Sequence, residues 1–187
     1  MHVSDAIDRR RAYRMISPQP LSEDDIHELL EAIRLAPSCF NHQPWRVTVA
    51  MGEDLSKVKE GLSRGNAWAT TAPAIMAVAA KPADDCRLGD GRDYYLFSTG
   101  LAIGQMLLRA TELGIVAHPI AGYKPSAVKE ALGIPNDHVL ITLVILGRHG
   151  DDDSLLSDEQ RERERTRPER KPPEENFFRE RWGYPWS

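Results

Sequence analysis

Residues 36–51 read APSCFNHQPWRVTVAM, a polar loop that runs straight into an alternating pattern. From Trp45 to Met51 apolar residues occupy every second position, which predicts a strand with one face in the core. Pro37 ends the helical pattern that precedes the loop. Residues 41–43 place adjacent amide and imidazole side chains between the helix and the strand, which is more than a plain connector needs. We therefore predict that this loop holds a ligand.

The sequence on either side of this stretch predicts further helices and strands. Ser22 is a helix N-cap followed by acidic residues, which complement the exposed N–H groups of a first turn. Ala74–Ala80 is apolar on both faces, as is typical of a central strand. The predicted helices cover 22–36, 54–62, 94–113 and 125–132, and the predicted strands cover 45–51, 74–80 and 139–146. A length of 187 residues suits one compact domain with a sizeable core.

The predicted helix 94–113 is apolar on nearly all sides. A helix with so little polar surface must be buried by its own fold or by a partner chain, and the sequence fits both. Gly100 and Gly104 lie one turn apart in this helix and let another backbone approach closely. Gly114 and Gly122 frame a predicted loop just past the helix, where backbone N–H groups could face a ligand.

The balance of charge limits the class of partner. The chain has 24 basic and 28 acidic residues, a formal net charge of −4, which argues against nucleic acid. An anionic ligand would need a local cluster of positive charge. Arg10, Arg11 and Arg14 form such a cluster, which is either a solvated helix face or a site for an anion such as phosphate.

The cysteines, histidines and apolar runs exclude several further classes. Cys39 and Cys86 are the only cysteines and form no Cys-x-x-Cys pair, and the amino terminus lacks the apolar core of a signal peptide. We interpret Cys39 as an inert small hydrophobe rather than a nucleophile. The histidines show no metal-binding spacing, so no metal is predicted. The longest apolar run, 139–146, is too short to span a bilayer. The protein is expected in the cytoplasm, without a membrane partner.

The composition changes at residue 151. Alternating Arg and Glu residues extend to Arg165, prolines follow, and five aromatic residues lie between Phe177 and Trp186. A charged, proline-bearing tail is compatible with disorder. Because exposed aromatic clusters are unusual, we expect this tail to wrap across a second subunit. The expected organisation is a core over 1–150 and a C-terminal extension over 151–187 within the same domain.

A series of motifs, in this order along the chain, resembles the FMN-dependent nitroreductase family. The motifs are RRAYR at 10–14, APSCFNHQPW at 36–45, GNAW at 65–68, AP at 72–73, ELG at 112–114, PIAG at 119–122, LGIP at 132–135 and RKP at 170–172. The resemblance covers nearly the whole chain, and the loop at 36–45 is its most specific part.

The resemblance implies a nitroreductase-like α+β fold: a central, mostly antiparallel sheet flanked by helices, in an intertwined homodimer with FMN bound between subunits. The arginines and Lys171 would hold the phosphate, and residues 37–41 would line the flavin from the other subunit. Asn66 would bond the pyrimidine edge, and the Ala121 N–H would lie near flavin N5. The implied FMN-binding residues are Arg10, Arg11, Ala12, Arg14, Pro37, Ser38, Cys39, Asn41, Asn66, Pro119, Ile120, Ala121, Gly122, Arg170 and Lys171.

The resemblance further implies an NAD(P)H-dependent oxidoreductase. It would reduce nitroaromatics, quinones or other small electron-poor acceptors by two-electron hydride transfer through flavin N5. The flavin carries the chemistry, so no catalytic side chain is predicted. Two alternatives stay open at the level of sequence: a flavin-dependent oxidative dehydrogenase on the same scaffold, and a non-catalytic flavin-binding protein.

Overall fold

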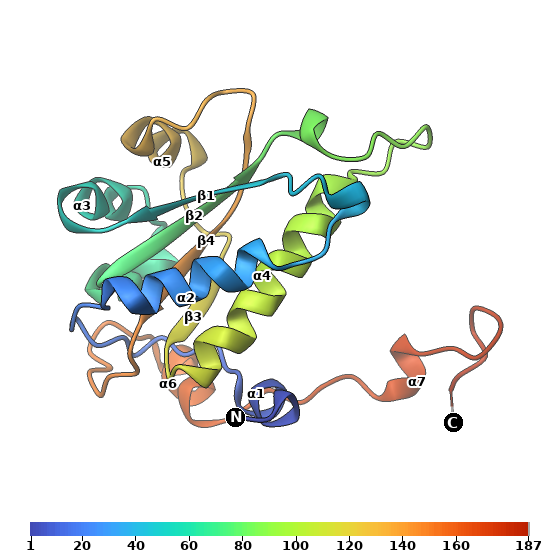
Figure 1. The fold of residues 1–187 in the computed structure, drawn as a ribbon. Coiled ribbons are helices and arrows are strands. Elements are labelled where there is room, and N and C mark those ends of the chain that lie inside the picture. Colours follow the sequence, from blue (N-terminus) through green and yellow to red (C-terminus); the bar gives the residue numbers. More distant parts are fainter. Residues whose placement is uncertain (187) are drawn as a thin grey trace.

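The computed structural model describes residues 1–186, and its centre is a four-stranded sheet with helices on both faces (Figure 1). The strands are β1 (Trp45–Ala50), β2 (Ala74–Ala80), β3 (Val116–Ile120) and β4 (Val139–Gly147). They pair antiparallel in the order β1-β2-β4-β3. The predicted α+β class and antiparallel sheet are confirmed.

The helices in the described part of the chain are α1 (Val3–Arg9), α2 (Glu23–Arg34), α3 (Gly52–Glu60), α4 (Tyr94–Glu112), α5 (Pro125–Leu132), α6 (Asp158–Arg165) and α7 (Pro173–Asn176), with short 3-10 segments at Cys39–Asn41, Arg64–Thr71 and Pro82–Asp84. Helices α2 and α4 cover one face of the sheet and α3 and α5 cover the other, as the two clusters of core residues show. Helix α2 packs on α4, and α3 packs on α5. Helix α2 begins where the sequence predicts it, because the Ser22 hydroxyl accepts the Asp25 N–H at 3.0 Å.

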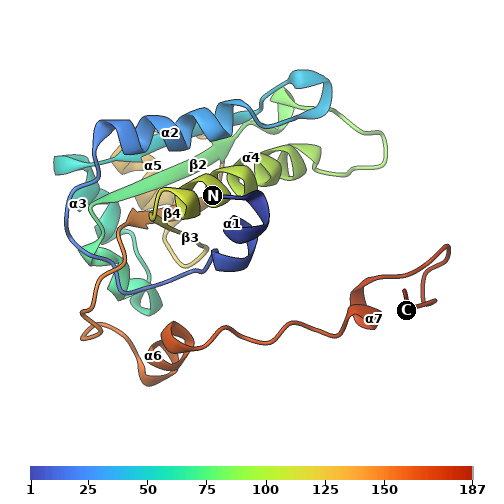
Figure 2. The same ribbon diagram turned by 60° about the horizontal axis from the view of Figure 1, so that its bottom comes forward.

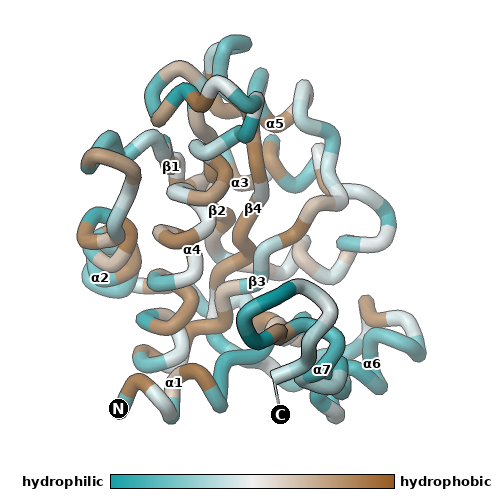
Figure 3. Tube along the Cα trace, turned by 90° about the vertical axis from the view of Figure 1, so that its right-hand side faces the viewer, coloured by the Kyte–Doolittle hydropathy of each residue, from teal (hydrophilic) through white to brown (hydrophobic). Residues whose placement is uncertain are grey.

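Strand β2 is buried along its whole length because both of its faces are covered. Met76 and Val78 belong to the core beneath α2 and α4, whereas Ile75 and Ala77 belong to the core beneath α3 and α5. This alternation is the period of two expected for a strand between two helical layers. Figure 3 shows the apolar residues gathered on the central strands, while the segment around α6 and α7 is mostly hydrophilic.

Strand β3 was not predicted from the sequence. Its presence places part of one predicted site segment in the sheet rather than in a loop. Pro119 and Ile120, expected in a loop, are the last residues of β3 and pair with Val144 and Leu143 of β4. Strand β3 lies at the edge of the sheet, where a proline costs no ladder hydrogen bond on its open side. Only Ala121 and Gly122 of the predicted loop follow the strand.

The C-terminal extension divides into two parts with different surroundings. Leu156 and Glu164 are buried against their own chain, so residues up to α6 pack on the domain from which they emerge. Beyond α6 the chain runs away from the body to α7, as Figure 2 shows. The aromatic residues of this second part are exposed, Trp182 to 89%. Ser187, the end of the predicted extension, lies outside the described residues. Within residues 1–186 no helix is long and apolar enough to cross a membrane.

Candidate functional site

Arginines from two distant segments surround a cavity of about 200 Å³. The lining residues are Arg10, Arg11, Ala12 and Arg14 after α1, and Arg163, Arg167, Pro168 and Arg170 in and after α6. Burial, together with the nearby charges of Arg167 and Arg170, lowers the pKa of the Arg10 guanidinium. Positive charge is thus crowded at this cavity, and a bound anion would relieve the repulsion.

A buried carboxylate fixes the backbone of the arginine segment. The Glu164 side chain is only 3% exposed. It accepts the backbone N–H of Arg14 at 2.9 Å and that of Met15 at 3.0 Å, and His149 Nε2 lies 3.2 Å from it. Such charge-assisted bonds contribute about 1.5–3 kcal/mol each, and losing the acceptor would leave buried donors without partners. Glu164 therefore fixes the backbone position from which the Arg14 side chain extends.

Two of the predicted phosphate ligands have other partners in this structure. The Arg11 guanidinium donates to the carbonyl oxygens of Arg163, Glu164 and Thr166 at 3.1, 3.0 and 2.8 Å. It therefore satisfies the carbonyl end of α6, which has no partners within the helix. Lys171 pairs with Glu175 at 3.0 Å and does not line the cavity, whereas Arg170 does.

The loop before β1 is held in an unusual backbone conformation. Phe40, Asn41 and Gln43 all have positive φ, of 45°, 59° and 49°. For residues other than glycine this costs on the order of 1–3 kcal/mol each, and it persists only where the surroundings enforce it. The Ser38 hydroxyl accepts the Gln43 N–H at 2.9 Å, and Gln43 Nε2 donates to the Asn41 backbone and side-chain oxygens, each at 3.1 Å. The polar residues of this loop thus support its own shape, and Phe40 is left 88% exposed.

Cys39 is bonded to Cys86, 47 residues further along the chain. Its interpretation as an inert small hydrophobe is therefore wrong. Two isolated cysteines at this separation give no recognisable spacing, and only the fold brings the loop before β1 beside the connection between β2 and α4.

Asn66 and Gly122, both predicted to bind FMN, lie against each other. The Asn66 side-chain amide donates to the Gly122 carbonyl at 2.9 Å, and so does the Ser63 N–H at 3.0 Å. A Cβ built on Gly122 would lie 2.5 Å from Ser63 Oγ and 2.6 Å from Asn66 Nδ2, so only glycine fits there. Gln160 of α6 also donates to the Gly65 carbonyl at 3.0 Å. Helix α6 therefore contacts both the arginine segment and the Asn66 segment.

The loop before β1 lies far from these groups within one chain. Cys39 N–H meets Ser98 Oγ at 3.5 Å near the start of α4. Arg11, which donates to the end of α6, lines a cavity together with Thr111 and Glu112 at the other end of α4. Helix α4 has 19 residues and is therefore about 28 Å long. The structure brings together the arginine segment, Arg170, Asn66 and residues 119–122, and it does not bring Pro37, Ser38, Cys39 and Asn41 to them.

His118 of β3 is a buried titratable residue beside the arginine segment. Its Nδ1 lies 2.9 Å from the Tyr13 carbonyl oxygen, and its ring lies 4.7 Å from that of Trp68. Burial is the largest cause that lowers the pKa of His118, to about 4. The imidazole is therefore neutral in the folded protein at neutral pH, with Nδ1–H donating to Tyr13.

The lowered pKa of His118 predicts a loss of stability in acid. As the pH falls below about 6.5, His118 is protonated in the unfolded chain before it is protonated in the folded protein. The stability that neutral His118 contributes is therefore complete above pH 6.5 and is lost between about pH 6.5 and 4. The expected loss is about 3 kcal/mol. Urea unfolding at several pH values in this range measures the free energy of unfolding of the parent and of the His118→Gln variant. Parallel curves for the two proteins would contradict the assignment.

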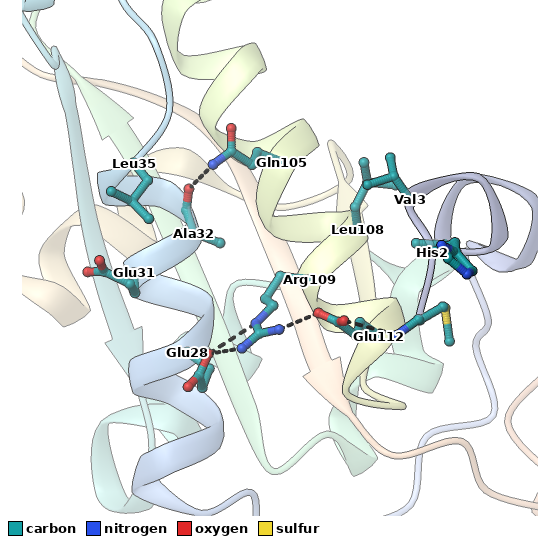
Figure 4. A pocket seen from close by; sticks show the side chains of 12 residues that line it. His2, Val3, Glu28, Glu31, Ala32, Leu35, Gln105, Leu108, Arg109 and Glu112 are labelled. Carbon is teal, nitrogen blue, oxygen red and sulfur yellow. Dashed lines mark hydrogen bonds and ion pairs between the residues drawn. The ribbon is translucent and has the colours of Figure 1, made fainter.

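A cavity of about 450 Å³ lies between α1, α2 and α4 and contains no predicted site residue (Figure 4). The Arg109 guanidinium lies between the carboxylates of Glu28 and Glu112, and the Gln105 amide donates to the Ala32 carbonyl at 3.0 Å. The other residues that line this cavity include Val3, Leu35 and Leu108, and they are largely apolar. Since Arg109 is already matched by two carboxylates, this cavity lacks the uncompensated positive charge of the arginine cavity.

Sequence reasoning missed three residues of the arginine cavity region. Arg163 and Arg167 are four residues apart and so share one side of a helical pattern, a signal that was available in the sequence. Glu164 gave no signal, because a glutamate within a run of alternating charges is typical of a solvated face.

Comparison with known proteins identifies the family of this chain. The sequence pattern of the Nitroreductase family matches residues 7–66 and 57–148. A protein of Archaeoglobus fulgidus, whose name proposes an NADH dehydrogenase/NAD(P)H nitroreductase, is 31% identical over 158 residues, which cover 81% of this chain and 88% of that protein. A Thermus thermophilus NADH dehydrogenase is 25% identical over 169 residues, which cover 74% of this chain and 82% of that protein. A crystal structure described as an oxidoreductase containing FMN has a TM-score of 0.85 and 28% identity, covering 98% of this chain and 94% of that one. The chain described here belongs to the nitroreductase family.

Proposed function

We propose that this protein is an FMN-dependent oxidoreductase that uses NADH or NADPH to reduce nitroaromatics, quinones or similar electron-poor acceptors. The observation that carries the proposal is the arginine cavity beside the Asn66–Gly122 contact. A cationic cavity suits the phosphate of FMN, and the adjoining polar segment suits the edge of a flavin ring. The names of the relatives support the nicotinamide and acceptor classes.

The residues present fit the cofactor. Arg10, Arg14 and Arg170 would hold the phosphate, while Arg11 and Glu164 keep α6 in place beside it. Asn66 would bond the pyrimidine edge, and the exposed Ala121 at the exit of β3 would offer its N–H to the ring. A backbone donor there would stabilise a reduced ring without adding a group that titrates.

When bound, FMN supplies the chemistry: it accepts two electrons as hydride from NAD(P)H and passes them to the acceptor. No side chain of this protein needs to act as acid, base or nucleophile. The residues bind and orient the cofactor and leave one face of it accessible to small molecules in turn.

A second copy of the chain would complete the site. Exposed residues recur at helical spacing along α4, with Phe97 56% and Leu101 38% exposed and Leu108 on the same side. Within residues 1–186, a Cβ added at Gly100 or Gly104 would meet no atom within 4 Å. An apolar stripe with small residues at its centre suits close packing against the same helix of a second subunit. The exposed aromatic residues beyond α6 would clasp that subunit.

The dimer also accounts for the position of the loop before β1. A loop at the far end of a helix about 28 Å long would reach the flavin of the partner rather than its own. Pro37, Ser38, Cys39 and Asn41 would then line that flavin.

The test is to purify the protein, record its visible spectrum and add NADH or NADPH without oxygen. The proposal expects a yellow protein that bleaches and regains its colour with a nitroaromatic or a quinone. A yellow protein that ignores both nicotinamides would favour a flavin carrier or an oxidative relative. A colourless protein that takes up no FMN would refute the proposal.

A further inference from the structure

The disulfide between Cys39 and Cys86 joins two surface segments that are far apart in the sequence. Cys39 belongs to the loop before β1, and Cys86 belongs to the connection over 81–93 between β2 and α4. Both cysteines are partly exposed. The sequence predicts a cytoplasmic protein, and disulfides formed in that compartment are mostly transient, catalytic or redox-sensing.

The loop tethered by this bond is the one that stores backbone strain. Positive φ at Phe40, Asn41 and Gln43 needs constraints from the surroundings. The disulfide and the approach of His42 Nδ1 to Asp85 Oδ1 at 3.5 Å join this loop to the connection over 81–93, and Cys39 N–H contacts Ser98 Oγ of α4 at 3.5 Å. Just after the loop, Arg46 of β1 also pairs with Asp84 of the connection at 3.1 Å. Both polar contacts of the loop itself are long, so the covalent bond is the strongest of its three constraints.

A cavity gives small molecules access to one sulfur of the pair. The cavity has a volume of about 360 Å³ and is lined by Cys86, Arg87, Leu88, Arg92 and Tyr94 among others, but not by Cys39. A small thiol entering it would meet Cys86 first. The charges at this cavity are balanced, because Arg92 pairs with Asp90 at 2.7 Å and Asp93 also lines it.

A buried carboxylate lies beside both sulfurs. The Asp85 side chain is 0% exposed, and one of its oxygens lies within 4.8 Å of both sulfur atoms. Its Oδ1 accepts the Cys86 N–H at 2.8 Å, whereas Oδ2 has no hydrogen-bond partner among the described residues. An anion at this distance disfavours a thiolate and therefore slows thiol–disulfide exchange.

We propose that Cys39 and Cys86 form a reversible thiol–disulfide site, reduced by low-molecular-weight thiols through the cavity at Cys86, whose oxidised state holds the loop before β1 in its flavin-binding shape. This proposal rests on the proposed function for its flavin part alone. In the first step a thiolate attacks Cys86 Sγ, the bond to Cys39 breaks, and Cys39 leaves as a thiolate that takes a proton from water. A second thiol then attacks the mixed disulfide and releases Cys86. In sum, two small thiols become one small disulfide, and the protein gains two thiols.

The first experiment equilibrates the full-length protein in glutathione buffers of graded potential and measures three quantities. These are the thiol count, the rate of chymotrypsin cleavage at the exposed Phe40, and the affinity for FMN. We expect the count to change between zero and two thiols in a single transition, with faster cleavage at Phe40 in the reduced form. If about a tenth of reduced molecules keep the loop shape, FMN binds roughly tenfold more weakly.

The Cys86→Ser variant supplies the control. It should show the reduced-state cleavage rate and FMN affinity at every potential, while its circular dichroism spectrum and melting transition establish that it is folded. Thiol counting and cleavage do not depend on FMN, so a protein that binds no flavin would refute the proposed function and leave these two readouts to decide the present one. A disulfide that never forms, or equal cleavage in both redox states, would overturn the proposal.

The second experiment tests Asp85. The Asp85→Asn variant should be reduced by glutathione severalfold faster than the parent. The control Asp24→Asn, which removes an exposed charge from α2, should be reduced at the rate of the parent. Equal rates for Asp85→Asn and the parent would contradict the role given to this carboxylate. Tight binding of one zinc ion by the reduced parent, lost in Asp85→Asn, would overturn the redox proposal and make Cys39, His42, Asp85 and Cys86 a metal site instead.

Discussion

Replacing Arg14 with glutamine is expected to weaken FMN binding by about 10- to 100-fold, because charge-assisted hydrogen bonds to phosphate contribute about 1.5–3 kcal/mol. Arg14 lines the cavity, and its backbone is fixed by Glu164. Riboflavin, which lacks the phosphate, should bind the variant and the parent within about twofold of each other. Quenching of flavin fluorescence during titration with each protein measures both affinities.

The matched control for this prediction is Arg165→Gln. Arg165 belongs to the same helix, α6, but it is exposed and does not line the cavity. The Arg165→Gln substitution removes the same charge from the protein, and the FMN affinity of this variant should stay within about twofold of that of the parent. Equal losses in the two variants would mean that net charge, rather than the cavity, governs binding. Equal losses of riboflavin and FMN affinity in Arg14→Gln would place Arg14 away from the phosphate.

Replacing Leu101 with aspartate is expected to convert the proposed dimer into monomers and to remove bound FMN. Leu101 lies at the centre of the exposed apolar stripe of α4, next to Gly100. An unpaired charge buried in an interface costs roughly 3–5 kcal/mol, so the dissociation constant of the dimer should rise by more than about 100-fold. Sedimentation velocity and the ratio of flavin to protein absorbance give the two readouts.

Met51→Asp is the matched control, because Met51 and Leu101 are both 38% exposed. Met51 is the N-cap of α3, on the other face of the sheet, where an aspartate suits the helix start. This variant should remain dimeric and hold FMN. A Leu101→Asp protein that stays dimeric would show that the subunits associate through a different face, and a monomer that keeps FMN would show that one chain suffices for the site.

Patterns of apolar residues in the sequence predicted strands β1, β2 and β4 and helices α2 to α5, whereas the α+β class and the antiparallel sheet followed from the family resemblance. The pattern of Ala74–Ala80 predicted β2 with both boundaries, since a strand covered on two faces contains apolar residues throughout. Strand β3 was missed because Val116–Ile120 is short and contains His118 and Pro119, residues that a central strand would exclude. An edge strand can contain both residues, but the edge position of β3 follows from the order of the strands in the sheet. The residues of β3 alone do not reveal it.

The candidate site was less predictable, because its key contacts join distant segments. The cluster around Arg10 was visible as a run of charge, but its partners Arg167 and Glu164 come from the other end of the chain. The bond of Cys39 to Cys86 likewise depends on the folded arrangement of two loops. The family resemblance supplied the expected cofactor-binding residues, whereas the hydrogen bonds between α6 and the arginine segment came from the structure.

The distance between the loop before β1 and the arginine cavity has a genetic consequence. If each flavin is served by the loop of one chain and the arginines of the other, two inactive alleles with defects in different segments would complement each other when expressed together. In a random mixture half of the molecules are hybrids, and each hybrid carries one site with both defects and one with neither, so about a quarter of all sites would be intact. Two alleles with defects in the same segment would restore none.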